Sequence, residues 1–204
     1  MKLTHHVHAK TLKAICENCH LLQKICICNL ITPVATRNRV SLVITKGEFA
    51  KMTNTGRLAH LLLQNSQIKV FGLPEKPLIK EDFLENGYRN LLLYPGSQNR
   101  FENFLQIDEP INLIVPDGNW GQAKKMVQKI AQLTPVTCVS LPLGPISEYM
   151  LRTHPDPQRI CTIEAIYRSF CILEKNPELE QLLKVFRIMR DRLVAMRAKP
   201  LSVR

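Results

Sequence analysis

The sequence predicts an α/β fold with a mainly parallel sheet and flanking helices. Five short runs of β-branched and other apolar residues alternate with segments that have the apolar spacing of helices, and this alternation is typical of parallel strands joined by crossover helices. Three of the runs are apolar along most of their length, as expected of strands covered on both faces. The chain has 204 residues, 45% of them hydrophobic, which is enough for one domain with a substantial core.

The first half of the chain is expected to contain two strands and one helix. The β-branched run VSLVIT predicts a strand over residues 40–45, and IKVFG predicts a second over 68–72. Between them, TNTGRLAHLLLQNS opens with three helix-capping residues and continues with helical apolar spacing. Residues 73–90 contain prolines and several charges, so we expect mostly loop with one helical turn near EDFLEN.

The second half alternates strands and helices more regularly. Strands are predicted at 90–94, 111–115 and 136–141. Helices are predicted from Asn119 or Trp120 to about Leu133, from Thr162 to about Lys175, and over 178–198. The last helix carries one apolar stripe, made of Leu179, Leu182, Phe186, Met189, Leu193 and Met196. Its basic side chains lie largely off that stripe and either contact RNA phosphates or form a solvated face: Lys184, Arg187, Arg190 and Arg197.

The chain is strongly basic, with a formal net charge of +11 and a pI of about 9.5. Both ends are basic and the middle is not, because residues 1–60 and 151–204 carry most of the excess of lysine and arginine over aspartate and glutamate. A polyanionic partner is therefore expected, nucleic acid first, although an ordinary solvated basic surface gives the same charge. The opening MKLTHHVHAK has no apolar run, and no segment approaches the length of a membrane helix. We expect a soluble, cytoplasmic protein with no membrane association.

Four of the seven cysteines lie close together, in the string CENCHLLQKICIC. Two close pairs can offer four thiolates to a zinc ion, which proteins bind tetrahedrally. We therefore expect a structural Zn²⁺ site in an N-terminal knuckle within residues 1–36, with the ligands Cys16, Cys19, Cys26 and Cys28. Four protein ligands leave no coordination position for a catalytic water. His20 is a weaker candidate ligand, and four reduced, unliganded cysteines are the alternative.

The segment INLIVPDGNWGQAKKM points most clearly to a reaction site. A buried strand leads through a Pro-Asp-Gly turn into a helix, which places Asp117 and Trp120 at the carboxyl end of a strand, where α/β sheets bind ligands. Asp117 is a candidate base or donor-binding group. Trp120 is the only tryptophan and can stack on a nucleobase. From the spacing alone, a purely structural role for both residues stays open.

The segment PDGNWGQAKKM resembles the defining motif of the DTW-domain family, Asp-x-Thr-Trp followed by Ala and Met at helical spacing. Asp117, Trp120, Ala123 and Met126 match. Asn119 stands where the family has threonine; it caps a helix equally well, but any role of the hydroxyl is lost. TNTGRLAHLLL, LLLYPG and LRTHPDPQRICTIEA resemble further family segments, the last with Cys161 in place of serine. The resemblance covers about residues 15–175.

This resemblance implies a SPOUT-like catalytic domain over residues 37–204, with a C-terminal trefoil knot. It also implies transfer of the 3-amino-3-carboxypropyl group of S-adenosylmethionine to N3 of a tRNA uridine, with methylthioadenosine as the second product. The donor pocket is expected at Tyr94, Pro95, Gly96, Asp117, Trp120, Leu141, Leu143 and Thr162. RNA contacts are expected at Arg57, Lys124, Arg152, Arg159 and Arg168.

The chemistry of this transfer sets further expectations. Uracil N3 is a poor nucleophile until it loses its proton, so Asp117 is the expected base, and the acceptor must be unpaired because N3 lies on the Watson–Crick edge. Glu164 is expected to position an arginine or a backbone group, and Cys138 and Cys171 to lie in the core. Two other functions stay open: S-adenosylmethionine-dependent RNA methylation, and zinc-knuckle RNA binding without catalysis. An rRNA acceptor is not excluded, and a monomer is favoured over a homodimer.

Overall fold

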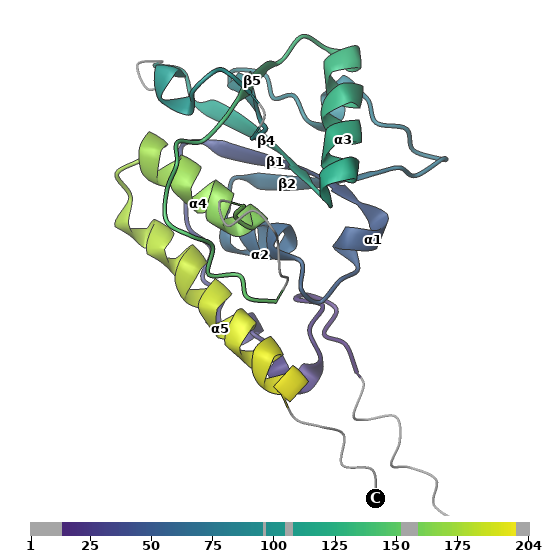
Figure 1. Cartoon of the computed structure of the whole chain (residues 1–204), viewed down its shortest axis with the longest axis vertical. Helices are drawn as coiled ribbons and strands as arrows, with labels where there is room; N and C mark the ends of the chain where they lie inside the picture. Colours follow the sequence, from purple (N-terminus) through teal and green to yellow (C-terminus); the bar gives the residue numbers. More distant parts are fainter. Residues whose placement is uncertain (1–13, 96, 105–107, 152–158, 199–204) are drawn as a thin grey trace, which may run out of the picture.

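The computed structural model describes residues 14–95, 97–104, 108–151 and 159–198 of the protein. At its centre lies a five-stranded sheet with the order β2-β1-β4-β3-β5, in which each neighbouring pair is parallel (Figure 1). The predicted α/β class with a parallel sheet is therefore confirmed. The strands are β1 (Arg39–Thr45), β2 (Ser66–Phe71), β3 (Arg89–Leu93), β4 (Ile111–Asp117) and β5 (Thr137–Val139).

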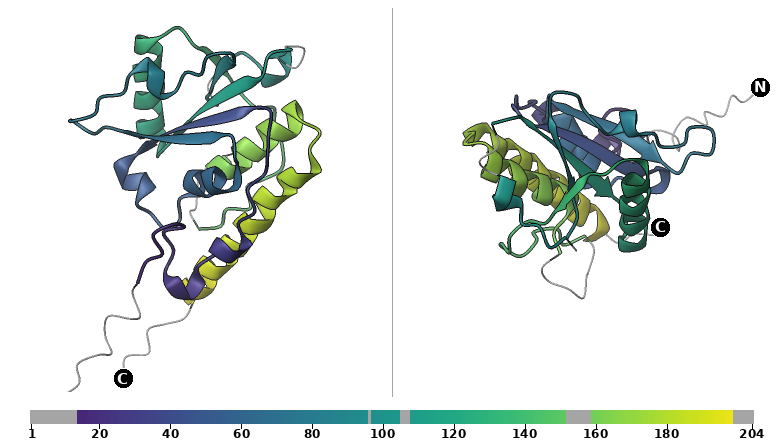
Figure 2. Two further views of the ribbon diagram at one scale, coloured as in Figure 1. Left: turned by 180° about the vertical axis from the view of Figure 1, so that it is seen from behind. Right: turned by 90° about the horizontal axis from the view of Figure 1, so that it is seen from above.

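Helices cover both faces of the sheet. α2 (Thr55–Leu62), α4 (Thr162–Leu173) and α5 (Glu180–Ala198) lie together on one face, and α3 (Trp120–Leu133) lies on the other (Figure 1 and Figure 2). The short helix α1 (Lys46–Phe49) follows β1 directly. None of the helices in the described part of the chain is long and apolar enough to span a membrane. Short 3-10 turns occur at Gln23–Ile25, Cys28–Leu30, Lys80–Asp82, Phe101–Phe104 and Pro177–Leu179.

Successive residues of the central strands point to opposite faces of the sheet. Leu42 and Leu113 belong to the core beneath α2, α4 and α5, whereas Val43 and Ile114 belong to the core beneath α3. All four residues are at most 1% exposed. β1 and β4 are thus buried on both faces, which explains why these strands are apolar along most of their length.

The predicted strands and longer helices are present within a few residues of their expected bounds. α1 is absent from the prediction, because four residues are too short to show a helical period. The stripe on α5 is buried as expected, with Met196 partly so. The core placement of Cys171 is wrong: this residue is exposed, because it lies one position beyond Phe170 and turns away from the buried side of α4. Cys138 is half-buried against the α3 core.

The N-terminal segment packs against α2 and α5. Leu21 and Ile27 are fully buried in the core that these helices share. Arg192 of α5 donates to the Cys26 carbonyl, and Gln181 Nε2 donates to the Leu30 carbonyl at 3.0 Å. The segment therefore contributes to the same hydrophobic core as the sheet and its helices.

Candidate functional site

A cavity of about 1050 Å³ lies at the carboxyl ends of the strands. Because all five strands are parallel, the connections that leave β1, β3, β4 and β5 meet at one edge of the sheet, and residues from each of them line the cavity. Open α/β sheets usually bind their ligands at this edge. Ligand pockets commonly measure about 300–1,000 Å³, so this cavity has room for a nucleotide-sized ligand and part of a second molecule.

The structure brings together the residues expected to bind the donor. Gly96 lies outside the described residues. The other seven line this one cavity, although they come from separate connections: Tyr94, Pro95, Asp117, Trp120, Leu141, Leu143 and Thr162. The two other residues that match the family motif lie on different sides of α3. Ala123 lines the cavity, whereas Met126 is buried between α3 and the sheet.

Asp117 is the last residue of β4 and is only 7% exposed. Thr162 Oγ1 donates to its Oδ1, and Asn54 Nδ2 donates to its Oδ2, each at 2.8 Å. The carboxylate therefore links the N-termini of α4 and α2 to the end of β4. Gly56 permits this close approach, because a Cβ at that position would lie 2.2 Å from Asp117 Oδ2.

Trp120 begins α3 and forms an aromatic wall of the cavity. Asn119 caps the helix, because its Oδ1 accepts from the Gln122 N–H at 2.9 Å while Gln122 Oε1 accepts from the Asn119 N–H at 2.8 Å; the helix start thus survives without the family's threonine. The Trp120 ring is stacked with that of Tyr94 at 5.6 Å between centroids, and the Arg159 guanidinium lies 4.5 Å from its centroid. Trp120 is 45% exposed, so part of this aromatic and cationic group remains accessible to a ligand.

The expectation that Arg57 contacts RNA is wrong. This residue is 4% exposed. Its guanidinium donates to the carbonyls of Phe49, Lys51 and Cys19, the last two at 3.1 and 3.2 Å. Burial lowers the pKa of Arg57 to about 10, so the side chain still carries its charge at neutral pH. Arg57 instead joins the loop after β1 to the cysteine segment.

The other predicted RNA contacts differ in position. Lys124 is exposed on α3, away from the cavity wall as the described residues define it. Arg159 and Arg168 line the cavity, and Arg168 also donates to the Pro145 carbonyl. Arg152 lies outside the described residues. The structure therefore brings two of the five arginines and lysines to the cavity.

The loop that follows β5 is held in place from two sides. Arg187 and Arg190 of α5 both bind Glu148, and together they lower the pKa of that carboxyl, with the Arg187 hydrogen bond as the largest cause. Glu164 accepts hydrogen bonds from Ser147 Oγ and from the Glu148 and Cys161 N–H groups at 2.6–2.8 Å. Glu164 thus positions backbone groups, as expected. Part of the basic face of α5 serves to hold this loop.

Three residues of the site are missed by the sequence prediction: Glu48, Asn54 as a partner of Asp117, and Tyr149. Glu48 lines the cavity and is buried. Tyr149 also lines it, and its hydroxyl donates to the Thr53 carbonyl at 2.8 Å. Asn54 could have been found, because the capping residues at 53–55 mark a helix N-terminus that points to the same edge of the sheet. No pattern in the sequence marks Glu48.

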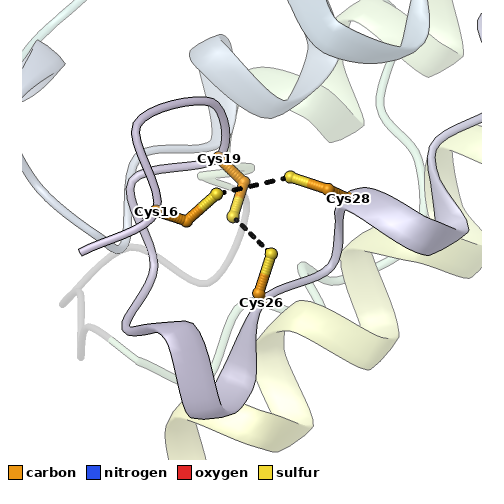
Figure 3. Close-up of side chains that lie close together, drawn as sticks. All are labelled: Cys16, Cys19, Cys26 and Cys28. Atoms are coloured by element: carbon orange, nitrogen blue, oxygen red, sulfur yellow. Dashed lines mark hydrogen bonds between the residues drawn. The ribbon is translucent and has the colours of Figure 1, made fainter. Parts of the chain in front are cut away.

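The cysteine cluster can hold a metal ion (Figure 3). The four sulfurs of Cys16, Cys19, Cys26 and Cys28 lie within 4.8 Å of one another. Cys16 and Cys28 are 3.5 Å apart, and Cys19 and Cys26 are 3.6 Å apart. Four thiolates about 2.3 Å from one tetrahedral metal would be about 3.8 Å apart, so the spacing fits a metal site and is too long for disulfides.

The surroundings shift the thiol pKa values of this cluster in opposite directions: burial raises the pKa of Cys19, and it raises that of Cys28 to about 12. The backbone N–H of Cys19, followed by that of Asn18, lowers the pKa of the Cys16 thiol from 9.0 to about 6, which favours its thiolate at neutral pH. His20 adopts a left-handed backbone conformation with φ of 57°. Its ring packs edge-on against Phe49 at 5.3 Å, outside the sulfur cluster, which supports cysteine as the ligand type.

Comparison with known proteins places this architecture in a family. The sequence model that defines the DTW-domain family matches residues 13–194 of the chain. Proteins named tRNA-uridine aminocarboxypropyltransferase 2 from Macaca fascicularis and Drosophila melanogaster are 27% and 26% identical to the chain. Each alignment covers 82% of this chain, and 59% and 70% of the respective relative. The mouse protein of the same name is 25% identical, with 59% of its length covered. No solved structure matches the chain.

Proposed function

The chain belongs to the DTW-domain family, and from this premise we propose that it transfers the 3-amino-3-carboxypropyl group of S-adenosylmethionine to N3 of a uridine in tRNA. Methylthioadenosine is the second product. The observation that carries the proposal is the single cavity that joins Asp117 to the Trp120 platform at the carboxyl edge of the sheet. The net charge of +11 suits an RNA substrate.

The cavity fits the donor in shape and chemistry. Tyr94 and Trp120 offer stacked rings to adenine, and Leu141 and Leu143 add apolar surface. When bound, S-adenosylmethionine supplies a carbon activated by the neighbouring sulfonium. The residues of this chain decide which carbon faces the acceptor, so orientation determines the product.

Asp117 is the proposed base for the uracil N3 proton. Its carboxylate lies at the end of β4 and is oriented by Asn54 and Thr162. Such fixed geometry is what proton transfer needs, since base and proton must come within hydrogen-bond distance. Arg159 and Arg168, which line the cavity, are proposed to attract the phosphates that flank the splayed-out nucleotide.

We propose that the cysteine cluster holds a structural zinc ion. Four cysteine sulfurs form the donor set that zinc prefers, and they leave no position for a substrate. The knuckle within residues 1–36 and the catalytic part over 37–204 then have separate tasks. We favour a monomer over a homodimer as the working form. Free cysteines and a tRNA substrate favour the cytoplasm as the place of action.

We further propose a SPOUT-like knotted topology. β5 pairs with β3, although β4 lies between them in the sequence. Residues 97–101 bond to the end of β5, since Ser97 Oγ donates to the Cys138 carbonyl at 2.8 Å and the Phe101 N–H donates to the Ser140 carbonyl at 2.9 Å. The connection after β3 thus lies against the end of β5, as a knot formed by the chain that follows β5 would require.

Trp120→Ala is expected to weaken the binding of S-adenosylmethionine roughly 10- to 100-fold, because stacking of a base on an aromatic ring contributes about 1–3 kcal/mol. Titration calorimetry measures the Kd of both proteins. Trp120→Phe retains a ring and should lose much less affinity. Equal affinities of the wild type and Trp120→Ala would exclude the stacking role. Because Trp120 is the only tryptophan, quenching of its fluorescence gives a second measure of binding to the wild type.

The function is tested by incubating the purified, zinc-loaded protein with unmodified tRNA and S-adenosylmethionine, followed by mass spectrometry of nucleosides and small molecules. Methylthioadenosine together with an aminocarboxypropyl-uridine is the expected result. S-adenosylhomocysteine with a methylated base would instead identify a methyltransferase. Binding of tRNA with no product and no affinity for the donor would leave RNA binding as the function.

A further inference from the structure

We propose that the loop over residues 141–151 binds the unpaired bases next to the target uridine through Ile146 and Met150, while arginines of α4 and α5 bind the adjoining phosphates. The inference rests on the proposed tRNA substrate and assigns a surface to it. The loop follows β5 and lines the cavity with Leu143 and Ile146. In the described part of the chain Met150 lies outside the cavity wall, so the loop leads out of the cavity.

Arginine side chains hold this loop at every third residue. Figure 1 shows the loop passing α4 and then α5. The contacts are, in order, Arg168 with the Pro145 carbonyl, Arg187 and Arg190 with the Glu148 carboxylate, and Arg197 with the Leu151 carbonyl. The backbone is therefore fixed along the loop, and its outward side chains are in place before a ligand binds.

Large apolar side chains of the loop face solvent between the held positions. Leu143, Ile146 and Met150 are 75%, 73% and 70% exposed. The polar residues between Ile146 and Met150 instead bond inward, to α4, α5 and the residues before α2. With Trp120, these three make up four of the seven large exposed hydrophobic residues in the described ranges. Exposed apolar surface is thus concentrated around the mouth of the cavity, as at a binding surface.

The surroundings of the loop are positively charged. Arg168 and Arg197 each donate to a backbone carbonyl, and within the described residues neither forms an ion pair with a carboxylate. Both guanidinium charges are therefore available to an anion, and arginine is well suited to phosphate. Arg187 and Arg190 share the Glu148 carboxylate. The loop thus combines exposed apolar side chains with cations that no carboxylate neutralises.

An unpaired RNA strand matches both properties of this surface. Each nucleotide has an apolar base face and an anionic phosphate. The sulfonium and ammonium of the donor outweigh its one carboxylate, so the donor gains little from arginine. An acidic protein would suit the charge, but it needs no continuity with the cavity. The neighbours of the target uridine do, because they are covalently attached to it.

Apolar side chains also suit a base that has been drawn out of its stack. A uridine that enters the cavity leaves its neighbours without a stacking partner. Nucleic-acid-binding proteins insert isoleucine and methionine side chains beside such unstacked bases. Ile146 at the cavity wall and Met150 beyond it are placed to cover two successive neighbours on one side of the uridine.

Filter binding with two RNA probes tests the base contacts. One probe is an RNA stem-loop with uridines in its loop, and the other is a fully paired RNA duplex. Ile146→Ser and Met150→Ser are each expected to weaken binding of the stem-loop roughly tenfold, because burial of an apolar side chain is lost, and to change binding of the duplex less than about twofold. Ile79→Ser, at an exposed apolar residue outside the cavity wall, should alter neither affinity.

Salt dependence separates the phosphate contacts from the base contacts. Arg197→Gln is expected to reduce the slope of log Kobs against log salt concentration by about 0.7–0.9 on the stem-loop, as the loss of one phosphate contact implies. Arg197→Lys retains the charge and should retain the slope. Ile146→Ser should lower the affinity at every salt concentration and leave the slope unchanged. An unchanged slope for Arg197→Gln would overturn the phosphate contact.

Three results would overturn the base contacts. Ile146→Ser and Met150→Ser could weaken both RNAs equally, or neither. Ile146→Ser could instead lose affinity for S-adenosylmethionine in titration calorimetry while keeping that for the stem-loop, which would assign Ile146 to the donor. A wild type that sediments as a dimer and an Ile146→Ser variant that sediments as a monomer, with equal RNA affinities, would identify an interface between two copies. Because both side chains are at least 70% exposed, melting temperatures should match the wild type and show that the variants fold.

The outcome is separable from that of the proposed function. A tRNA assay that yields a methylated base would overturn the aminocarboxypropyl transfer, while the selective loss of stem-loop binding would still support the loop as an RNA surface. Aminocarboxypropyl-uridine formed by Ile146→Ser at the wild-type rate and with unchanged RNA affinity would overturn the inference and leave the proposed function intact.

Discussion

Asp117→Ala is expected to reduce transfer to tRNA by at least about a hundredfold, because a positioned general base contributes about 10²–10⁴-fold. The affinity for tRNA should stay within about twofold, since this carboxylate is only 7% exposed and would contact a single base of the tRNA. Single-turnover rates with excess enzyme measure the chemical step, and filter binding measures the affinity for tRNA. Full activity of Asp117→Ala would exclude Asp117 as the base.

Gly56→Ala tests whether the position of Asp117 matters as well as its charge. The added methyl group would lie 2.2 Å from Asp117 Oδ2 and 3.2 Å from Leu42 Cδ2, so the carboxylate must move. Overpacking of this kind costs about 1–3 kcal/mol of stability, and a displacement of about 1 Å can cost about a hundredfold in rate. Gly47→Ala is the control, because no atom lies within 4 Å of a Cβ there. Equal rates for the two variants would contradict the positional requirement.

Removal of the metal is expected to lower the melting temperature by more than about 10 °C. Binding to a structural zinc site contributes about 10–16 kcal/mol in small peptides, whereas a whole domain is stable by only about 5–15 kcal/mol. The knuckle also covers the core, as Leu21 and Ile27 are fully buried. Thermal unfolding with and without a chelator, together with elemental analysis, measures the effect.

Cys19→Ser is expected to reproduce the loss, because Cys19 is buried and belongs to the cluster. Cys171→Ser is its control, since Cys171 is exposed and lies on α4, outside the cluster. A protein that purifies without metal and melts at the same temperature with chelator would show that the cysteines are not a metal site.

Much of the fold can be predicted from the sequence, because the strands and longer helices each leave a periodic or apolar pattern. The cysteine cluster and the reaction edge also have local signatures in CENCHLLQKICIC and PDGNW. Arg57 shows where local reasoning fails. The expected RNA contact needs an exposed side chain, but Arg57 is buried against carbonyls from Phe49 and Cys19, which only the tertiary structure brings near.

Glu48 is a residue of the cavity wall that the sequence analysis did not single out. An acid in a Lys-Gly-Glu-Phe turn has the composition of an exposed loop, and nothing nearby marks it as buried. Its place in the cavity wall follows from the sheet order, which sets the end of β1 beside that of β4. Such placement depends on contacts between distant segments, which a linear pattern does not record.

The three carbonyl bonds of Arg57 mean that the knuckle is not a portable module. A fragment that begins at residue 37 would leave this guanidinium without the Cys19 carbonyl, and would uncover the apolar surface that Leu21 and Ile27 shield. A knuckle transplanted onto another enzyme would lack the same anchor. Shortened versions of this protein for biotechnology should therefore retain the cysteine segment, even where their design concerns only the cavity around Asp117.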